Sequence, residues 1–232
     1  MPATRPTPTA RGPVVSAEAV TKVIGEVTLL PPTSLRAESG QVLVVQGRNG
    51  IGKTTLLRIL AGVLEPTSGS ALIDGQAADE RDRRQRGRVA ALIGAPAAYR
   101  DLTLADHLTL VDATWGREAA SCEERVDAAL AQVGIGELGG RFPHELSSGQ
   151  TQLFRLALAL FRPSDLLILD EPEQRLDTDK RELIERLLAA RRDDGTTLVV
   201  ACHDPDLTAA IADQVLDLGW EPAAESSRGP DE

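Results

Sequence analysis

Short apolar runs alternate with longer stretches of helical spacing along most of this chain. The apolar runs, several of them rich in β-branched residues, predict strands at residues 14–20, 27–30, 33–37, 41–45, 71–73, 89–93, 166–169, 196–201 and 215–218. Apolar residues three or four positions apart predict helices at residues 52–61, 104–111, 119–133, 150–161, 178–191 and 207–212. Strands that bracket helices, with runs apolar enough for burial on both faces, indicate an α/β fold around a mostly parallel sheet.

The predicted elements fill one domain at residues 14–220. We expect an antiparallel β region at its start, where Pro31-Pro32 favours an edge or a bend over a central strand. The block of helices at about residues 95–162 predicts an inserted helical subdomain. Residues 1–13 and 221–232 have no apolar core, so we expect disordered tails there.

Charge and cysteine content narrow the class of protein. The net charge of −10 argues against a protein that mainly binds a nucleic-acid backbone, because that task needs a basic surface. Cys122 and Cys202 match no metal-ligand spacing, so two reduced thiols of a cytosolic protein are expected. No apolar run approaches the ~18–20 residues of a spanning helix, and residues 1–13 lack the apolar centre of a secretion signal.

A glycine-rich loop joins the strand at 41–45 to the helix at 52–61. Its residues fit the pattern G-x-x-x-x-G-K-[ST] and are Gly47, Arg48, Asn49, Gly50, Ile51, Gly52, Lys53 and Thr54, with Thr55 next. Glycines let backbone N–H groups turn towards a phosphate, and Lys53 supplies a positive charge for the outer phosphates. Thr54 offers a hydroxyl to Mg²⁺, and the helix adds its positive N-terminal end. A glycine-rich turn without ligand is the alternative, but strand, loop and helix all agree with a nucleotide site.

Polar residues end two further predicted strands. Asp170 and Glu171 follow the strand at 166–169, and carboxylates there are costly unless they have a partner. We expect Asp170 to hold Mg²⁺ through water and Glu171 to act on the attacking water as general base, although an acidic loop start is the alternative. His203 follows the strand at 196–201; a lone histidine is more often structural, but at a strand end we expect it to bond the γ-phosphate.

The segment Leu146-Ser147-Ser148-Gly149-Gln150 opens the apolar helix at 150–161. Small residues at a helix N-terminus suit an anion, although Ser-Ser-Gly alone indicates only a turn. The segment closely resembles the ABC signature LSGGQ, with Ser148 in place of one glycine. Residues 14–218 thus resemble the ABC ATPase family, which implies a P-loop NTPase core with an inserted helical subdomain.

The resemblance implies a role for each motif. Residues 47–54 look like the Walker A loop, 166–170 like Walker B, Glu171 like the catalytic carboxylate, 174–177 like the D-loop and His203 like the switch histidine. The family works as a head-to-tail dimer with ATP between the Walker A loop of one subunit and the signature of the other. Ser147, Gly149 and Gln150 would therefore act on nucleotide held by the partner chain.

The resemblance also implies a transport ATPase that uses ATP and Mg²⁺. Its expected partners are a separate membrane permease and a second ABC ATPase, in a homodimer or heterodimer, with no nucleic acid. Its expected place is the cytoplasm, on the inner face of the cell membrane. The alternatives are a soluble ABC ATPase of DNA repair, translation or regulation, which the net charge opposes, and a P-loop kinase or GTPase, which the signature opposes.

Some positions depart from the family pattern. Ile24 stands where an adenine-stacking aromatic is expected, and Gly94 where the Q-loop glutamine would link Mg²⁺ to the membrane partner. Gln174 and Arg175 replace small D-loop residues. Because the phosphate-loop lysine, both carboxylates and the histidine remain, we interpret the chain as a divergent, active ATPase. The basic run at 81–88 reads as a solvated loop, with a permease or lipid contact as the alternative.

Overall fold

The computed structural model describes residues 11–94 and 98–219, and its centre is a five-stranded sheet. Across this sheet the strand order is β6-β7-β8-β3-β9, and every pairing is parallel. The strands are β3 (Val42–Gln46), β6 (Val89–Leu92), β7 (Leu166–Asp170), β8 (Thr197–Ala201) and β9 (Gln214–Asp217). Because parallel strands end at the same edge, Gln46, Asp170 and Ala201 come together there.

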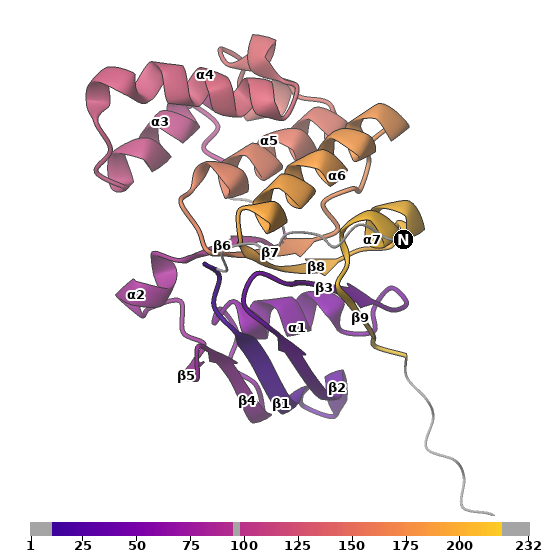
Figure 1. Cartoon of the computed structure of the whole chain (residues 1–232). Helices are drawn as coiled ribbons and strands as arrows, with labels where there is room; N and C mark the ends of the chain where they lie inside the picture. Colours follow the sequence, from indigo (N-terminus) through magenta and orange to yellow (C-terminus); the bar gives the residue numbers. More distant parts are fainter. Residues whose placement is uncertain (1–10, 95–97, 220–232) are drawn as a thin grey trace, which may run out of the picture.

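The two faces of this sheet bury alternate residues of the same strands. On one face Leu43, Ile168 and Val199 pack with α1 (Lys53–Leu60); on the other, Val44 and Leu169 pack with α5 (Ser148–Phe161). Figure 1 shows α1 beneath the sheet and α5 above it, beside α6 (Thr178–Asp193) and α7 (Pro205–Ile211). Burial on both faces explains the unbroken apolar runs of the sequence.

A second, antiparallel sheet lies below α1 in Figure 1. Its order is β2-β1-β4-β5, with β1 at Val15–Ile24, β2 at Val27–Ala37, β4 at Ser68–Ile73 and β5 at Gln76–Ala77. The strands predicted at 27–30 and 33–37 are one strand, so their predicted separation is wrong, whereas the predicted edge position of Pro31-Pro32 is confirmed. The prolines are tolerated because β2 is an edge strand and β1 has a register shift between Val20 and Lys22 opposite them.

Two helices, α3 (Leu104–Thr114) and α4 (Cys122–Gln132), form a layer beyond α5 (Figure 1). The buried Asp112 of α3 receives hydrogen bonds from Arg125 of α4 and from Arg117. The hydrogen bonds from Arg125 lower the pKa of Asp112 to about 2. Short 3-10 turns at Ala119–Ser121, Gly136–Leu138 and Pro143–Glu145 complete the connections towards α5.

The predicted α/β fold, with a parallel sheet, an N-terminal antiparallel region and helices, is confirmed, and the structure corrects two details. The basic run is not only a loop, because Asp82 caps a short helix, α2 (Arg83–Arg86), by accepting bonds from two of its N–H groups. Residues 11–13, placed in the N-terminal tail, are hydrogen-bonded to the main body, where Arg11 and Gly12 donate to Gly195 O. The remaining tail positions lie outside the described residues.

Candidate functional site

The loop at residues 47–54 curves because three glycines take backbone angles that other residues avoid. Gly47, Gly50 and Gly52 have φ values of 140°, 81° and 112°. At Gly52 the space is also closed, since an added Cβ would lie 2.5 Å from the Leu29 carbonyl oxygen. Helix α1 starts directly after Gly52, with no acidic residue in its first turn. Its positive end is therefore free to face an anion.

Lys53 is held inside the loop that it follows. Its ammonium Nζ donates to Gly47 O at 2.9 Å and to Arg48 O at 3.3 Å, and the side chain is only 5% exposed. The nearest carboxylate oxygen, Glu171 Oε1, is 3.9 Å away. Since its closest acceptors are neutral carbonyl oxygens, the ammonium group can exchange these bonds for stronger ones to an incoming phosphate. The next residues, Thr54 and Thr55, lie half-buried in the first turn of α1.

Asp170 has one satisfied and one unsatisfied oxygen. Thr54 Oγ1 donates to Asp170 Oδ2 at 2.7 Å, which joins the start of α1 to the end of β7. The other oxygen, Oδ1, is buried and has no hydrogen-bond partner among the described residues. A hydroxyl beside an unpartnered carboxylate oxygen fits Mg²⁺, which takes few protein oxygens and completes its shell with water and phosphate. This pair is the candidate metal position.

Glu171 sits at a turn, where its side chain meets those of two predicted neighbours. Its φ is +49°, outside the regions that most residues adopt, and its N–H donates to Ala201 O at the end of β8. His203 Nε2 lies 3.1 Å from Glu171 Oε1, and Gln174 Nε2 donates to Oε2 at 2.8 Å. The strained turn thus aims the carboxylate into the space between the phosphate loop and His203.

An open cavity of about 420 Å³ lies beside the Glu171 carboxylate. Its lining includes Asn49, Glu171, Gln174, Arg175 and His203. A second one, of about 600 Å³, lies along Gly47, Arg48 and His203. The loop therefore has open space on both sides. The structure brings together the phosphate loop, both carboxylates and the histidine, as the sequence predicted for one nucleotide site.

The signature-like segment lies apart from this group. Ser147 caps α5 by accepting a bond from Gln150 N–H, and Gln150 Oε1 accepts from Ser147 N–H in return. Ser147 and Ser148 are exposed, and an added Cβ at Gly149 would lie 3.1 Å from Arg175 O. Among the described residues, no hydrogen bond joins residues 147–150 to residues 47–54. The two predicted half-sites do not meet within one chain.

The departures from the family pattern are visible in the structure. Ile24 ends β1 with 59% of its surface exposed and offers no aromatic face. Gly94 has a φ of +68°, so a glutamine there would be strained. The carbonyl oxygen of Gly94 accepts a bond from Arg155 Nη2. Sequence reasoning missed Arg155 and Gln152, and the only signal for them was that both are polar on an apolar helix.

Elsewhere, the described residues hold no second candidate for such chemistry. Both cysteines are free, and burial raises the pKa of the Cys202 thiol to about 12, which makes it a poor nucleophile. No group of three or more metal-binding side chains occurs among the described residues. In the same part of the chain, no helix has the length and apolar content to span a membrane.

Comparison with known proteins places this geometry in context. A family model described as ABC transporter matches residues 30–174. The Fe(3+) ions import ATP-binding protein FbpC of Brucella melitensis is 36% identical over 210 residues, which are 87% of this chain and 57% of that protein. The methionine import ATP-binding protein MetN of Corynebacterium diphtheriae is 34% identical over 213 residues, 88% of this chain and 63% of that protein.

The spermidine/putrescine import ATP-binding protein PotA of Nitrosomonas europaea is 34% identical over 197 residues, 84% of this chain and 54% of that protein. The chain thus spans 54% to 63% of the length of these relatives. A dimeric ATP-binding cassette solved in a post-hydrolysis state with ADP and Pi superposes with a TM-score of 0.79 at 23% identity, covering 88% of this chain and 93% of the cassette. At that identity the likeness shows the fold alone.

Proposed function

The chain belongs to the ABC transporter family, and from that premise we propose that it binds and hydrolyses ATP with Mg²⁺. The observation that carries the proposal is the meeting of Lys53, Asp170 and Glu171 beside one glycine-rich loop. ATP would place its phosphates in the curve of residues 47–54, where Lys53 exchanges bonds to loop carbonyls for bonds to the β- and γ-phosphates. Asn49, Gly50 and Thr55 complete the proposed binding loop and first turn.

The chemistry follows from the position of Glu171. Its carboxylate is aimed by the strained turn and accepts the proton of the water that attacks the γ-phosphorus, while ADP leaves. His203 lies 3.1 Å from the same carboxylate and would donate to a γ-phosphate oxygen, which orients the group for transfer. Thr54 and Asp170 would hold Mg²⁺, which supplies charge neutralisation at the phosphates when bound.

The second half of the site comes, in our proposal, from another subunit. Ser147, Gly149 and Gln150 stand at the N-terminus of the 14-residue helix α5, on the sheet face opposite to α1 (Figure 1). The side-chain oxygens of Ser147 and Gln150 each accept a bond from the backbone N–H of the other, and Ser147 and Ser148 are exposed, so a phosphate on a facing chain could approach this helix start. We propose a head-to-tail dimer, either with a second copy or with another ABC ATPase.

We also propose that hydrolysis drives transport through a separate membrane permease, with this chain on the cytoplasmic face. The relatives named above import iron(III), polyamines or methionine, which supports import as the direction but no particular cargo. A groove of about 640 Å³ between α2 and α3 offers a docking surface, lined by Arg83, Arg86, Trp115 and Arg162. Among the described residues no carboxylate pairs with these arginines, so the groove suits an acidic permease segment.

Two measurements test the proposal. Purified protein should hydrolyse ATP in Mg²⁺ and lose this activity in excess EDTA. Gentle extraction of membranes should recover the chain with an integral membrane protein, and Arg83→Glu/Arg86→Glu should weaken that recovery while leaving ATP binding intact. Recovery only with ribosomes or DNA, in a salt-sensitive complex, would instead support the soluble ABC ATPase.

A further inference from the structure

We infer that Arg155 and Gln152 form a positioning relay that couples the loop after β6 to the turn that carries Glu171. This inference rests on the proposed function, because it concerns the carboxylate assigned there as general base. It starts from Gly94, whose missing side chain leaves the loop after β6 without its expected glutamine. The relay would supply the missing connection from the opposite side, from helix α5.

The first link joins α5 to the loop. Arg155 Nη2 donates to the carbonyl oxygen of Gly94, two residues beyond the end of β6. Gly94 has the left-handed φ of +68°, and its ideal Cβ would lie 3.2 Å from Arg58 Nη2. The left-handed φ disfavours a side chain at this position, and the Gly94 carbonyl is bonded to α5 through Arg155.

The second link joins Arg155 to the catalytic turn. Its other terminal nitrogen, Nη1, donates to Gln152 Oε1 at 3.0 Å. Gln152 is only 4% exposed, and its Nε2 donates to Glu171 O at 3.0 Å and to Pro172 O at 3.1 Å. The two side chains therefore form an unbroken path from Gly94 O to the backbone of the turn whose φ of +49° aims Glu171.

Charge and burial indicate a specific role for an arginine in this place. Burial lowers the pKa of Arg155, the negative charge of Asp170 opposes that effect, and the positive charge of Arg175 adds to it. Its Nε is buried without a partner among the described residues. A partly desolvated arginine with an unsatisfied nitrogen is costly for stability alone. The planar fork is suited to reaching two acceptors at once, Gly94 O and Gln152 Oε1, which a lysine cannot do in the same way.

The relay makes the position of Glu171 depend on that of Gly94. A displacement of Gly94 O would pass through the hydrogen bonds of Arg155 and Gln152 to the turn. Arg155 is thus a positioning residue, whereas Glu171 is the catalytic one.

The test compares Arg155→Met with Arg191→Met in the full-length chain. Arg191 is a matched control: burial lowers its pKa as well, and it donates to the Leu160 carbonyl oxygen, away from the site. We expect Arg155→Met to lower kcat for ATP by about tenfold or more with unchanged KM. Arg155→Lys should restore part of the loss, and Arg191→Met should leave kcat at the parental value.

Amide hydrogen exchange supplies a readout that needs no nucleotide. Arg155→Met should speed exchange in peptides covering residues 166–176 by about threefold or more, and Arg191→Met should not. Gln152→Met should speed exchange in these peptides to a similar extent. The double variant Arg155→Met/Gln152→Met should show no faster exchange than either single variant, because both changes break the same path. Equal exchange in both arginine variants would overturn the relay. If the parental chain lacks ATPase activity, the proposed function fails while the exchange result still decides on the relay.

Discussion

The glycine-rich phosphate loop and the signature-like segment with its two serines each lead into a helix, yet their surroundings differ. Around the loop, groups from three strand ends converge. Lys53 Nζ lies 3.9 Å from Glu171 Oε1, and Thr54 Oγ1 donates to Asp170 Oδ2 at 2.7 Å. Around the segment, apart from the backbone hydrogen bonds inside α5, the hydrogen bonds of Ser147 and Gln150 within the described part of the chain are to each other and to Thr151. Polar and charged side chains of the same chain thus lie beside the phosphate loop, whereas Ser147 and Ser148 at the start of α5 are exposed.

This difference shows which part of the chemistry one chain completes. In our proposal, the loop side supplies a cation for phosphate (Lys53), a carboxylate oxygen for metal (Asp170 Oδ1) and a carboxylate for water (Glu171). The segment would supply a helix N-terminus for the phosphate of a facing chain. The two regions become one site only if a second chain brings its segment to the loop of the first. Substitutions in the phosphate loop and in the signature-like segment should therefore affect different quantities, ATP binding in the first case and turnover in the second.

The largest effect is expected from Glu171→Gln. The amide keeps the size and the hydrogen bond from Gln174 but cannot take a proton from water, so kcat should fall by about 10²–10⁴-fold. ATP should still bind, and the closed dimer should accumulate in gel filtration. Hydrolysis at the parental rate would show that Glu171 is not the base.

A charge on the segment should act almost as strongly on turnover. Ser148→Asp places a carboxylate at the exposed first residue of α5, where it favours the helix but repels a facing phosphate. We expect kcat to fall by about 10²-fold with unchanged thermal stability and unchanged ATP binding to the monomer. Gly140→Asp adds the same charge at an open, exposed position and should have no effect.

Loss of the loop cation should instead appear in binding. Lys53→Ala removes the ammonium that the loop holds for phosphate, and the Kd for ATP should rise by about 10- to 100-fold. Isothermal titration calorimetry measures this directly. An unchanged Kd would mean that the phosphates do not sit in the loop, whereas Ser148→Asp is expected to leave the Kd alone.

The smallest effect is one of stability. Ser147→Ala removes the N-cap of α5 and should lower the free energy of unfolding by about 1 kcal/mol. Urea denaturation checks the value. A loss of several kcal/mol would mean that the segment is tied into the fold more firmly than its exposed, self-bonded side chains indicate.

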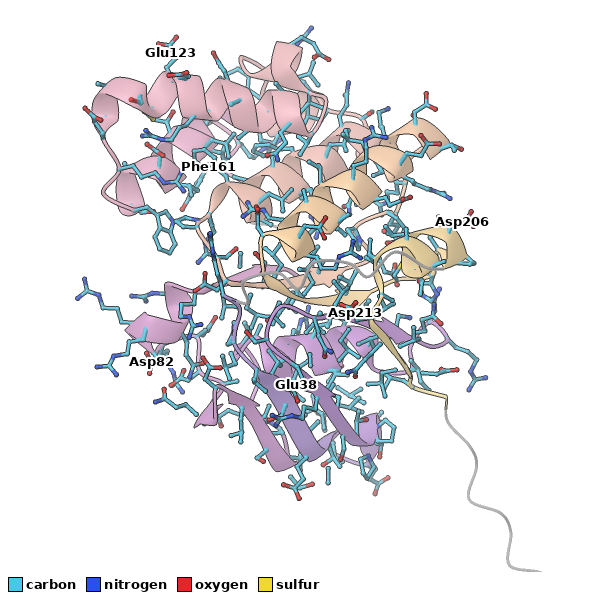
Figure 2. All side chains as sticks on the ribbon, in the orientation of Figure 1. Glu38, Asp82, Glu123, Phe161, Asp206 and Asp213 are labelled. Atoms are coloured by element: carbon cyan, nitrogen blue, oxygen red, sulfur yellow. The ribbon has the colours of Figure 1, made fainter. Side chains whose placement is uncertain are left out.

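Features that depend on the local pattern of residues were predicted well from the sequence. The glycine-rich loop, the apolar strand before Asp170 and the helix start at Ser147 each have a local signature, and each is found in place. The sequence predicted the edge position of Pro31-Pro32 but failed to predict that β2 runs unbroken through both prolines, because that depends on how β1 pairs opposite them. It also failed at α2, which is a single turn stabilised by the Asp82 cap (Figure 2).

Arg155 shows a different limit. As a polar residue on an apolar helix it has no readable partner in the sequence, since its acceptor Gly94 is 61 positions away and contributes only a backbone oxygen. Every residue has the same backbone carbonyl group, so a sequence motif cannot reveal which carbonyl a side chain will bond. The missing glutamine at position 94 was visible in the sequence, but the side chain that bonds the Gly94 carbonyl oxygen was not.

Mixing two inactive variants tests the shared site most directly. Lys53→Ala and Ser148→Asp, each purified alone, should hydrolyse ATP poorly, and a mixed dimer should contain one doubly damaged and one intact site. With random mixing of identical subunits, we predict recovery of about a quarter of the parental rate, since half of the dimers are mixed and each has one working site of two. No recovery after verified subunit exchange would contradict a site built from the loop of one chain and the segment of another.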